Sequence, residues 1–308
     1  MRIAAITVNW NRTELTLRCL ESLLAARRAP DEIYVVDNGS DPDPSETFRA
    51  CWPGLRVLRH PRNLGFAAGV NLGLREGLRG PSEAFFVVNN DAVVHEDCLV
   101  RLEEALEEDP TRAVVGAKTL TRERPPRIHT AYGVLTFHGP LVQQRGWMEE
   151  DIRAYDRMSE VDYVSGCAML LRREAVERVG LFDEFFFAYH EDLDWCTRAW
   201  KAGFRVVYVP SAIVFHEMHA STGGGGYESP ITYLSQRNAI LFVKKHATKP
   251  QLLKFALHLP VNLLKDAVLR ARRREWRGYR LRVRGLVDGL LGREVPVSEL
   301  GLDGHGSS

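Results

Sequence analysis

The sequence lacks the features that mark membrane-spanning, secreted and zinc-binding chains. No apolar run approaches the roughly 20 residues that cross a bilayer, and the longest candidate, residues 252–269, is interrupted by charged side chains and Pro260. The five cysteines are odd in number and none forms a Cys-x-x-Cys pair. This pattern excludes a disulfide framework and a zinc knuckle, and it fits a reducing compartment. Because no signal peptide precedes the first strand-like segment, we expect a cytoplasmic protein.

The sequence also has little net charge. A value of +1 over 308 residues excludes a globally basic nucleic-acid binder, so we expect no nucleic-acid partner. The charge is unevenly placed, however, because residues 265–284 carry nine basic and two acidic side chains. That segment has a charge of +7, and the remaining residues sum to −6.

Strand-like and helix-like segments alternate through the first 120 residues. Apolar runs predict strands at 3–8, 32–38, 55–60, 84–88 and 113–117. Helical spacing of apolar residues predicts helices near 15–24, 63–78 and 95–106. Asn11 and Glu14 have the spacing of a capping pair at the start of the first helix. The alternation favours an α/β fold with a mostly parallel central sheet and helices on both faces.

The later sequence divides into an irregular segment, a further α/β stretch and a helical end. Residues 121–160 show little periodicity, which indicates an active-site excursion. We expect one catalytic domain at 1–245, with a nucleotide-binding half at about 1–120 and an acceptor half at about 121–245. Residues 246–308 should form a basic helical extension with a flexible tail.

Polar clusters follow several of the predicted strands. They are residues 9–11, 37–40, 89–91 and His216. Each cluster alone fits a turn, because Asn and Asp are favoured there, and Asp91 also fits the N-cap of a following helix. In open α/β sheets, however, ligands bind beyond the carboxyl ends of the strands. Four clusters on one edge therefore favour a ligand site.

The order of these motifs resembles that of family-2 glycosyltransferases, which have a GT-A fold. The matching motifs are Asn9-Trp10-Asn11-Arg12, Asp37-Asn38-Gly39-Ser40, Asn63-Leu64-Gly65-Phe66, Asn89-Asn90-Asp91, Gly180-Leu181-Phe182-Asp183 and Glu191-Asp192-Leu193-Asp194-Trp195. The resemblance covers roughly residues 3 to 240 and is strongest to bacterial rhamnosyltransferase-like enzymes, whose Arg-Asn signature is similar to Arg237-Asn238. It implies a nucleoside-diphosphate sugar donor, dTDP-rhamnose or a UDP-sugar, and a glycan or lipid-linked acceptor used in surface polysaccharide synthesis.

The resemblance also implies a divalent cation, Mn²⁺ or Mg²⁺, on the donor diphosphate. These ions prefer oxygen ligands, and one or two carboxylates plus the phosphates suffice. We expect Asp91 and His216 to be the protein ligands, with His219 as the rival to His216. Asn89 stands where the family usually has the first acid of its Asp-x-Asp motif, so it is expected to bond the ribose or a metal-bound water instead.

Nucleotide binding is assigned to residues of the first two strands and the later loops. Asp37 is expected to accept the imide N–H of uracil or thymine, and Trp10 to stack on the base unless it is a core aromatic. A glycine-rich lid is expected at residues 223–226. The full nucleotide set is Val8, Trp10, Arg12, Asp37, Asn63, Gly65, Asn71, Asn89, Asn90, Ser221, Thr222 and Arg237.

The family pattern places the catalytic base on Asp192, which would take the proton of the acceptor hydroxyl. A single base and the lack of a recognisable covalent nucleophile imply inversion of configuration. Glu191 and the segment Ser165, Gly166 and Cys167 are expected on the acceptor side. The alternative for that segment is a small-residue strand packed under a helix.

Two rival functions are open at this stage. A sugar nucleotidyltransferase would need a glycine-rich basic loop after the first strand, and residues 9–14 contain no glycine. A non-catalytic protein that binds sugar nucleotides would not need the acid at Asp192.

The basic segment gives a further expectation. Apolar residues at helical spacing before it, with Trp276 and Tyr279 among its arginines, suit the surface of an anionic membrane. The alternative is an amphipathic helix packed on the catalytic domain. The basic segment therefore predicts a peripheral protein at the inner face of the cell membrane.

Overall fold

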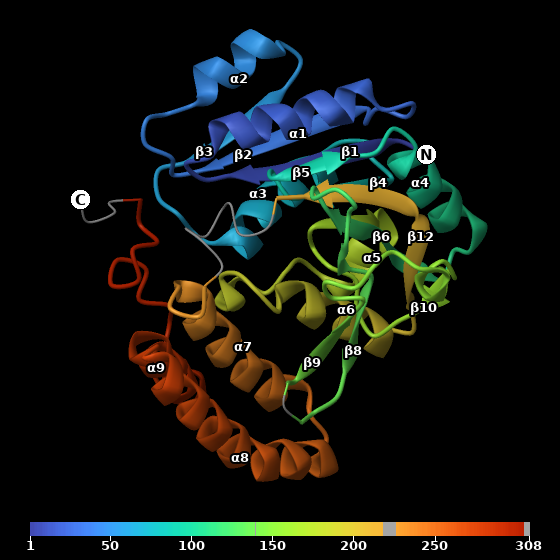
Figure 1. Ribbon diagram of the computed structural model, residues 1–308. Helices are drawn as coiled ribbons and strands as arrows, with labels where there is room; N and C mark the ends of the chain where they lie inside the picture. The colour runs from blue at the N-terminus through green and yellow to red at the C-terminus, as the bar shows by residue number, and fades with distance from the viewer. Residues whose placement is uncertain (139, 218–225, 305–308) are drawn as a thin grey trace.

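The molecule is built around a central β-sheet (Figure 1). The computed structural model describes residues 1–138, 140–217 and 226–304. The strand order is β10-β12-β6-β11-β4-β1-β2-β3, with β5 paired to β12 and β7 to β6. The strands β3, β2, β1 and β4 run parallel to one another, and β6 runs parallel to β12. Between these groups β11 runs antiparallel to both β4 and β6. The predicted α/β fold with a mostly parallel central sheet is confirmed.

The strands are bounded as follows: β1 Ile3–Asn9, β2 Glu32–Asn38, β3 Arg56–His60, β4 Ala84–Val88, β5 Ala92–Val94, β6 Arg112–Thr121, β7 Ile128–Thr130, β8 Tyr132–Leu135, β9 Val142–Arg145, β10 Ser159–Glu160, β11 Ala168–Arg172 and β12 Arg205–His216. The helices are α1 Thr13–Ala25, α2 Ser45–Cys51, α3 Phe66–Arg79, α4 Cys98–Glu108, α5 Arg173–Val179, α6 Glu191–Lys201, α7 Pro230–His246, α8 Lys249–Arg273 and α9 Trp276–Leu291, with short 3₁₀ turns at Arg153–Tyr155 and Glu184–Phe186. β8 and β9 form a separate hairpin.

Helices cover both faces of the sheet because alternate residues of each strand point to opposite faces. Along β1, Ala4 and Ile6 enter the core cluster shared with α3, α5 and α6, whereas Ile3 and Ala5 enter the cluster shared with α1, α2 and α4. β4 is buried along its whole length, as expected for a strand between two helical layers. The two layers lie on opposite sides of the sheet in Figure 1.

The start of α1 differs from the sequence prediction. Its N-cap is Arg12, without a capping side chain. The side chain of Asn11 does not cap the helix, because its Oδ1 accepts a hydrogen bond from the Asp41 amide at 2.9 Å. The predicted Asn11–Glu14 capping pair is therefore wrong.

The C-terminal helices pack beside the α/β domain. α7 and α9 approach closely at two glycines: a Cβ on Gly285 would lie 2.4 Å from the Tyr233 carbonyl oxygen, and one on Gly289 would lie 2.7 Å from that of Arg237. After α9 the chain returns to the catalytic domain, where Leu302 is buried with Phe187. The end of the chain, predicted as a flexible tail, is therefore packed against the domain at Leu302. Among the described residues, no helix has the length and apolar character to cross a bilayer.

Candidate active site

A cavity of about 890 Å³ opens beyond the carboxyl ends of β1 and β4, where the topology of an α/β sheet places ligands. Its walls also come from the segment before β11, the start of α6, the end of β12, and the inner sides of α7 and α8. The sequence-predicted site residues that line it are Val8, Trp10, Asn63, Gly65, Asn89, Asn90, Asp91, Ser165, Gly166, Cys167, Glu191, Asp192 and His216.

One end of the cavity holds an acid–imidazole pair. Asp91 Oδ1 lies 2.9 Å from His216 Nε2, and both side chains are almost fully buried. The pairing of β5 with β12 explains this contact, since the register joins Ala92 to His216 and so places Asp91 beside the imidazole. Asp91 precedes the strand β5, so the alternative that it caps a helix is wrong.

The surroundings of His216 favour its charged form. Burial alone would lower its pKa, but the neighbouring Cys167 and Asp91 outweigh burial and raise the pKa well above its ordinary value. Asn89 Nδ2 lies 3.3 Å from His216 Nε2, and the His129 ring stacks on the imidazole with centroids 4.9 Å apart. Within the described residues, no cluster of three or more His, Cys, Asp or Glu side chains surrounds a common point.

The cavity lining also includes two carboxyl groups at the start of α6. Asp192 Oδ2 accepts the Gly166 amide at 2.9 Å, and its Oδ1 accepts the Leu193 amide at 2.7 Å. Burial raises the pKa of Asp192, although those amide hydrogen bonds oppose the shift. Burial and the charge of Asp192 raise the pKa of Glu191 well above its ordinary value. The surroundings of Glu191 therefore favour its protonated form beside Asp192.

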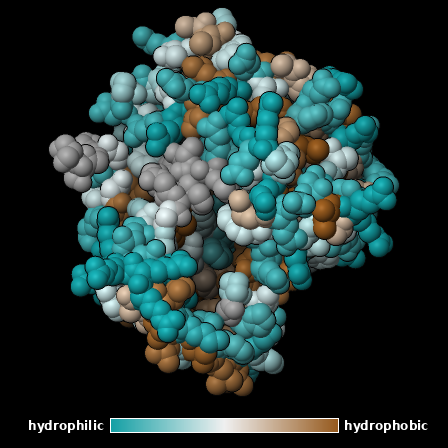
Figure 2. All heavy atoms as spheres, viewed as in Figure 1, coloured by the Kyte–Doolittle hydropathy of each residue, from teal (hydrophilic) through white to brown (hydrophobic). Residues whose placement is uncertain are grey.

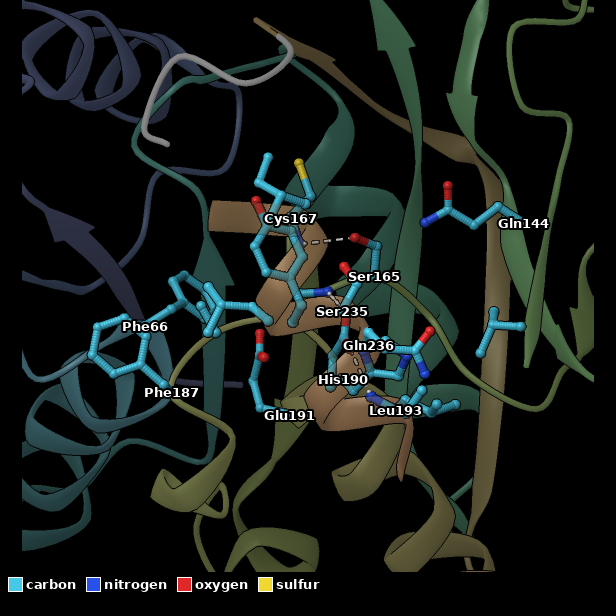
Figure 3. A pocket seen from close by; sticks show the side chains of 18 of the residues that line it. Phe66, Gln144, Ser165, Cys167, Phe187, His190, Glu191, Leu193, Ser235 and Gln236 are labelled. Atoms are coloured by element: carbon cyan, nitrogen blue, oxygen red, sulfur yellow. Dashed lines mark hydrogen bonds between the residues drawn. The ribbon is translucent and has the colours of Figure 1, made fainter. Parts of the chain in front are cut away.

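The carboxyl group of Glu191 extends into the cavity, with Phe66 and Phe187 to one side of it in Figure 3. Its Oε2 is buried and has no hydrogen-bond partner among the described residues. Across the cavity in the same view lie Ser165 and Cys167, linked by a hydrogen bond from the Cys167 amide to Ser165 Oγ at 3.2 Å. This part of the cavity combines apolar walls with a few polar groups, as small-molecule sites commonly do.

The third acid of α6 has a structural role. Asp194 is fully buried and turns away from the cavity to contact Arg198, Lys245 and His246 at 2.7 to 2.8 Å. Burial alone would raise its pKa, but hydrogen bonds from His246 and Lys245 together with the Arg198 charge lower it to about 2. This cluster fixes the end of α7 to α6.

Four predicted nucleotide residues lie outside the cavity lining. Asp37 is fully buried: its Oδ1 accepts Asn9 Nδ2 at 2.9 Å, and its Oδ2 accepts an Arg59 guanidinium N–H at 2.6 Å. Asn71 is buried against the Phe182 backbone, with hydrogen bonds at 2.9 and 3.0 Å. Arg12 is exposed at the start of α1.

The fourth of these residues, Arg237, is fully buried in α7. Its guanidinium donates to the carbonyl oxygens of Arg293, at 2.7 and 3.0 Å, and of Phe185, at 2.9 Å. The structure therefore does not bring the guanidinium to the cavity. The predicted residues Ser221 and Thr222, the rival His219 and most of the glycine-rich lid lie outside the described residues.

Sequence reasoning missed several residues of the cavity. Leu302 lines it, and its carbonyl accepts Asn63 Nδ2 at 2.8 Å. Phe255, Leu259 and Asn262 of α8 form another part of the wall. The helical pattern of α8 was visible in the sequence, but no local signal shows which face meets the catalytic domain.

Comparison with known proteins shows the family that this chain matches. The model of the "Glycosyltransferase like family 2" matches residues 1–238. The chain is 29% identical over 247 residues to the N-acetylglucosaminyl-diphospho-decaprenol L-rhamnosyltransferase of Mycobacterium tuberculosis. This alignment covers 73% of this chain and 78% of that protein. The chain is 24% identical over 199 residues to the low-salt glycan biosynthesis hexosyltransferase Agl10 of Haloferax volcanii, which covers 64% and 61% respectively.

Solved structures share the fold at low sequence identity. The mannosyltransferase PcManGT of Pyrobaculum calidifontis, in complex with GDP-Man and Mn²⁺, has a TM-score of 0.60 and 19% identity, covering 95% of this chain and 88% of that one. GalNAc-T7, with UDP, GalNAc and Mn²⁺, has a TM-score of 0.62 and 15% identity, covering 79% and 48%. These similarities establish the GT-A architecture.

Proposed function

This chain belongs to the glycosyltransferase-like family 2, and on that premise we propose that it is an inverting, metal-assisted transferase. It moves a sugar from a nucleoside-diphosphate sugar, dTDP-rhamnose or a UDP-sugar, to a hydroxyl group of a glycan or lipid-linked acceptor. The product belongs to surface polysaccharide synthesis. The rhamnose preference rests on the similarity to the mycobacterial L-rhamnosyltransferase.

The observation that carries the proposal is the presence of two chemically different groups in the lining of one cavity. Asp91 and His216 form a buried acid–imidazole pair, and Asp192 presents a separate carboxyl group oriented by backbone amides. A nucleoside-diphosphate sugar has the matching asymmetry: its diphosphate is anionic, and its anomeric carbon is the point of attack.

The Asp91–His216 pair fits a divalent cation. A carboxylate and a neutral imidazole are ligands that Mn²⁺ accepts, together with phosphate oxygens and waters. A cation would therefore have to displace the proton that the Asp91 and Cys167 side chains favour on His216 when the cation is absent. A cation bound there would supply positive charge to the diphosphate as it leaves. Asn89, whose Nδ2 lies 3.3 Å from His216 Nε2, would bond the ribose or a metal-bound water.

Asp192 acts as the general base in this proposal. Its carboxylate takes the proton of the acceptor hydroxyl while that oxygen forms a bond to the anomeric carbon. The bond from this carbon to the diphosphate oxygen breaks at the same time, and the nucleoside diphosphate keeps the electron pair. Attack from the side opposite the leaving group inverts the configuration. The amides of Gly166 and Leu193 hold the carboxylate in position.

The nucleoside portion is assigned to the end of β1 and the loop before α3. Trp10, Asn63 and Gly65 line the cavity there, and the indole ring offers a stacking face for a base. Asp37 supports this end by orienting Asn9 across the β1–β2 pair. Its predicted contact with the base stays a prediction.

A lipid-linked acceptor would place the enzyme at the inner face of the cell membrane as a peripheral protein. The mycobacterial relative is named for N-acetylglucosaminyl-diphospho-decaprenol, in which a sugar is joined to a polyprenyl chain through a diphosphate. An acceptor of that class fits the apolar walls contributed by Phe255 and Leu259 at the acceptor side.

The test is an assay of nucleoside diphosphate release. The protein is incubated with dTDP-rhamnose, UDP-sugars and GDP-mannose in Mn²⁺, and slow donor hydrolysis is followed without acceptor. We expect release from one donor class, and none from the Asp192→Asn variant. Donor binding without release in the wild type would favour a non-catalytic binding protein. Pyrophosphate release from a nucleoside triphosphate and a sugar 1-phosphate would identify a nucleotidyltransferase.

A further inference from the structure

The helix α8 has two opposite faces with different environments. Phe255, Leu259 and Asn262 line the cavity, and Asp266, one turn further on, is buried. These residues recur at helical spacing and therefore share one side of the helix. This inner face is held in place by Asp266, which contacts Arg270 at 3.0 Å and Arg282 of α9 at 2.8 Å.

The opposite face of α8 is an exposed apolar stripe. It consists of Leu253, Leu257, Val261, Leu264 and Val268, whose exposed fractions are 61, 64, 50, 67 and 49%. Their spacing of three and four residues places them in one continuous row. In Figure 2, hydrophobic spheres gather along the lower edge of the molecule, where Figure 1 places α8. Contiguous apolar patches of this kind mark interaction sites.

Basic side chains follow the stripe at the C-terminal end of α8 and in the start of α9. Arg270 and Arg282 are paired with acids. A second group is exposed and forms no ion pair within the described residues: Lys265, Arg272, Arg273, Arg274, Arg277 and Arg280. Trp276, at the turn into α9, is 47% exposed. An apolar row beside basic residues and a tryptophan is the composition of a helix that lies in a bilayer interface.

We propose that the stripe Leu253–Leu257–Val261–Leu264–Val268 docks on an anionic lipid bilayer, so that the inner face of the same helix holds one wall of the cavity at the membrane surface. Anionic headgroups complement the +7 charge of residues 265–284. A second copy of this chain would bring two segments of that charge together, and like charges disfavour such an interface.

This geometry also gives a path for an acceptor, a step that rests on the proposed function. A polyprenyl chain would remain among the lipids beside the outer face of α8. Its diphosphate sugar would reach the cavity past Leu259 and Asn262, which lie on the inner face. The docking itself does not depend on the chemistry in the cavity.

Vesicle sedimentation tests the docking. The full chain is mixed at low salt with vesicles of phosphatidylcholine and phosphatidylglycerol, and with phosphatidylcholine alone. We expect the protein to sediment with the anionic vesicles and to bind them at least tenfold more weakly at high salt. Leu257→Glu/Leu264→Glu and Arg272→Glu/Arg273→Glu should each reduce binding at least tenfold. The matched controls, Leu24→Glu in α1 and Arg49→Glu in α2, change exposed residues at the opposite end of the molecule and should bind as wild type does.

The outcomes separate this inference from the proposed function. All variants should keep the circular dichroism spectrum and the dTDP-rhamnose hydrolysis rate of the wild type, because none of the changed residues lies in the cavity. Hydrolysis without vesicle binding would overturn the docking and leave the transferase intact. Vesicle binding without hydrolysis would leave the docking intact and count against the transferase. A dimer in sedimentation velocity that Leu257→Glu/Leu264→Glu dissociates, with no vesicle binding, would assign the stripe to a second copy and overturn the proposal.

Discussion

At the scale of single residues, Glu191 and Asp192 occupy neighbouring positions but should have different roles. Asp192 is oriented by two backbone amides, whereas burial and the charge of Asp192 raise the pKa of Glu191 well above its ordinary value and so favour its protonated form. A protonated carboxyl group cannot accept the hydroxyl proton. This difference supports Asp192 as the proposed base.

Replacing each acid by its amide should distinguish the two roles. Asp192→Asn should lower kcat by roughly two to four orders of magnitude, the usual contribution of a general base, with donor affinity unchanged. Glu191→Gln should keep kcat within a few fold, because the amide matches a protonated carboxyl group. Steady-state kinetics with the donor that the hydrolysis assay selects would check both. If the Gln variant lost as much activity as the Asn variant, Glu191 would share in proton transfer.

The raised pKa of Glu191 also predicts how stability depends on pH. The folded state holds a proton that the unfolded state releases near the ordinary value of 4.5. The free energy of unfolding should therefore fall as pH rises above that value, until Glu191 ionises in the folded state. Urea unfolding of wild type and Glu191→Gln between pH 5 and 9 would measure this. The variant should gain stability relative to wild type as pH rises, and a constant difference would contradict the assignment.

The metal assignment gives a prediction for Asp91. Asp91→Ala removes one of the two protein ligands, so it should abolish transfer and weaken binding of the nucleoside diphosphate in Mn²⁺. In EDTA the affinities of wild type and variant should be similar, because the cation link is absent from both. Calorimetric titration under both conditions makes the comparison. An equal loss in Mn²⁺ and in EDTA would show that Asp91 acts without a cation.

At the scale of elements, α6 and α7 are joined through the buried carboxylate of Asp194. Asp194→Asn leaves Lys245, His246 and Arg198 without their shared anion. We expect a loss of roughly 3 kcal/mol in the free energy of unfolding at pH 7. The lowered pKa means that the carboxylate's contribution is complete above its unfolded value of 3.8 and is lost as pH falls towards about 2. The wild-type advantage in urea unfolding should therefore shrink in that acid range.

The elements themselves were largely predictable from sequence. The strands β1, β2 and β4 and the helices α1, α3 and α4 follow from local periodicity, which depends only on neighbouring residues. Much of the cavity lining, including Asp91 after β4 and Asp192 in the first turn of α6, followed from motif order. The cavity roles proposed for Asn71 and Arg237 did not match their positions, because both are buried and satisfy backbone carbonyl groups. A motif does not show whether a polar side chain faces a ligand or its own backbone.

At the scale of the whole molecule, the C-terminal segment completes the catalytic domain. Leu302 is only 4% exposed and packs with Phe187. Leu302→Ala should lower the free energy of unfolding by about 2 kcal/mol through lost burial. It should also weaken nucleoside diphosphate binding, because Leu302 lines the cavity and its carbonyl holds Asn63. Urea unfolding and calorimetry would check both effects. Wild-type nucleotide affinity in a destabilised variant would restrict Leu302 to a packing role.

The contact between Leu302 and Asn63 also orders events during protein synthesis. The two residues are 239 positions apart, and domains fold from the N-terminal side as the chain emerges from the ribosome. The sheet strands β1 to β4 can pair early in translation. The wall that Leu302 adds beside Asn63 is absent until residue 302 has left the exit tunnel. A nascent chain that has not yet reached this point therefore has an incomplete cavity, even when its sheet is already paired.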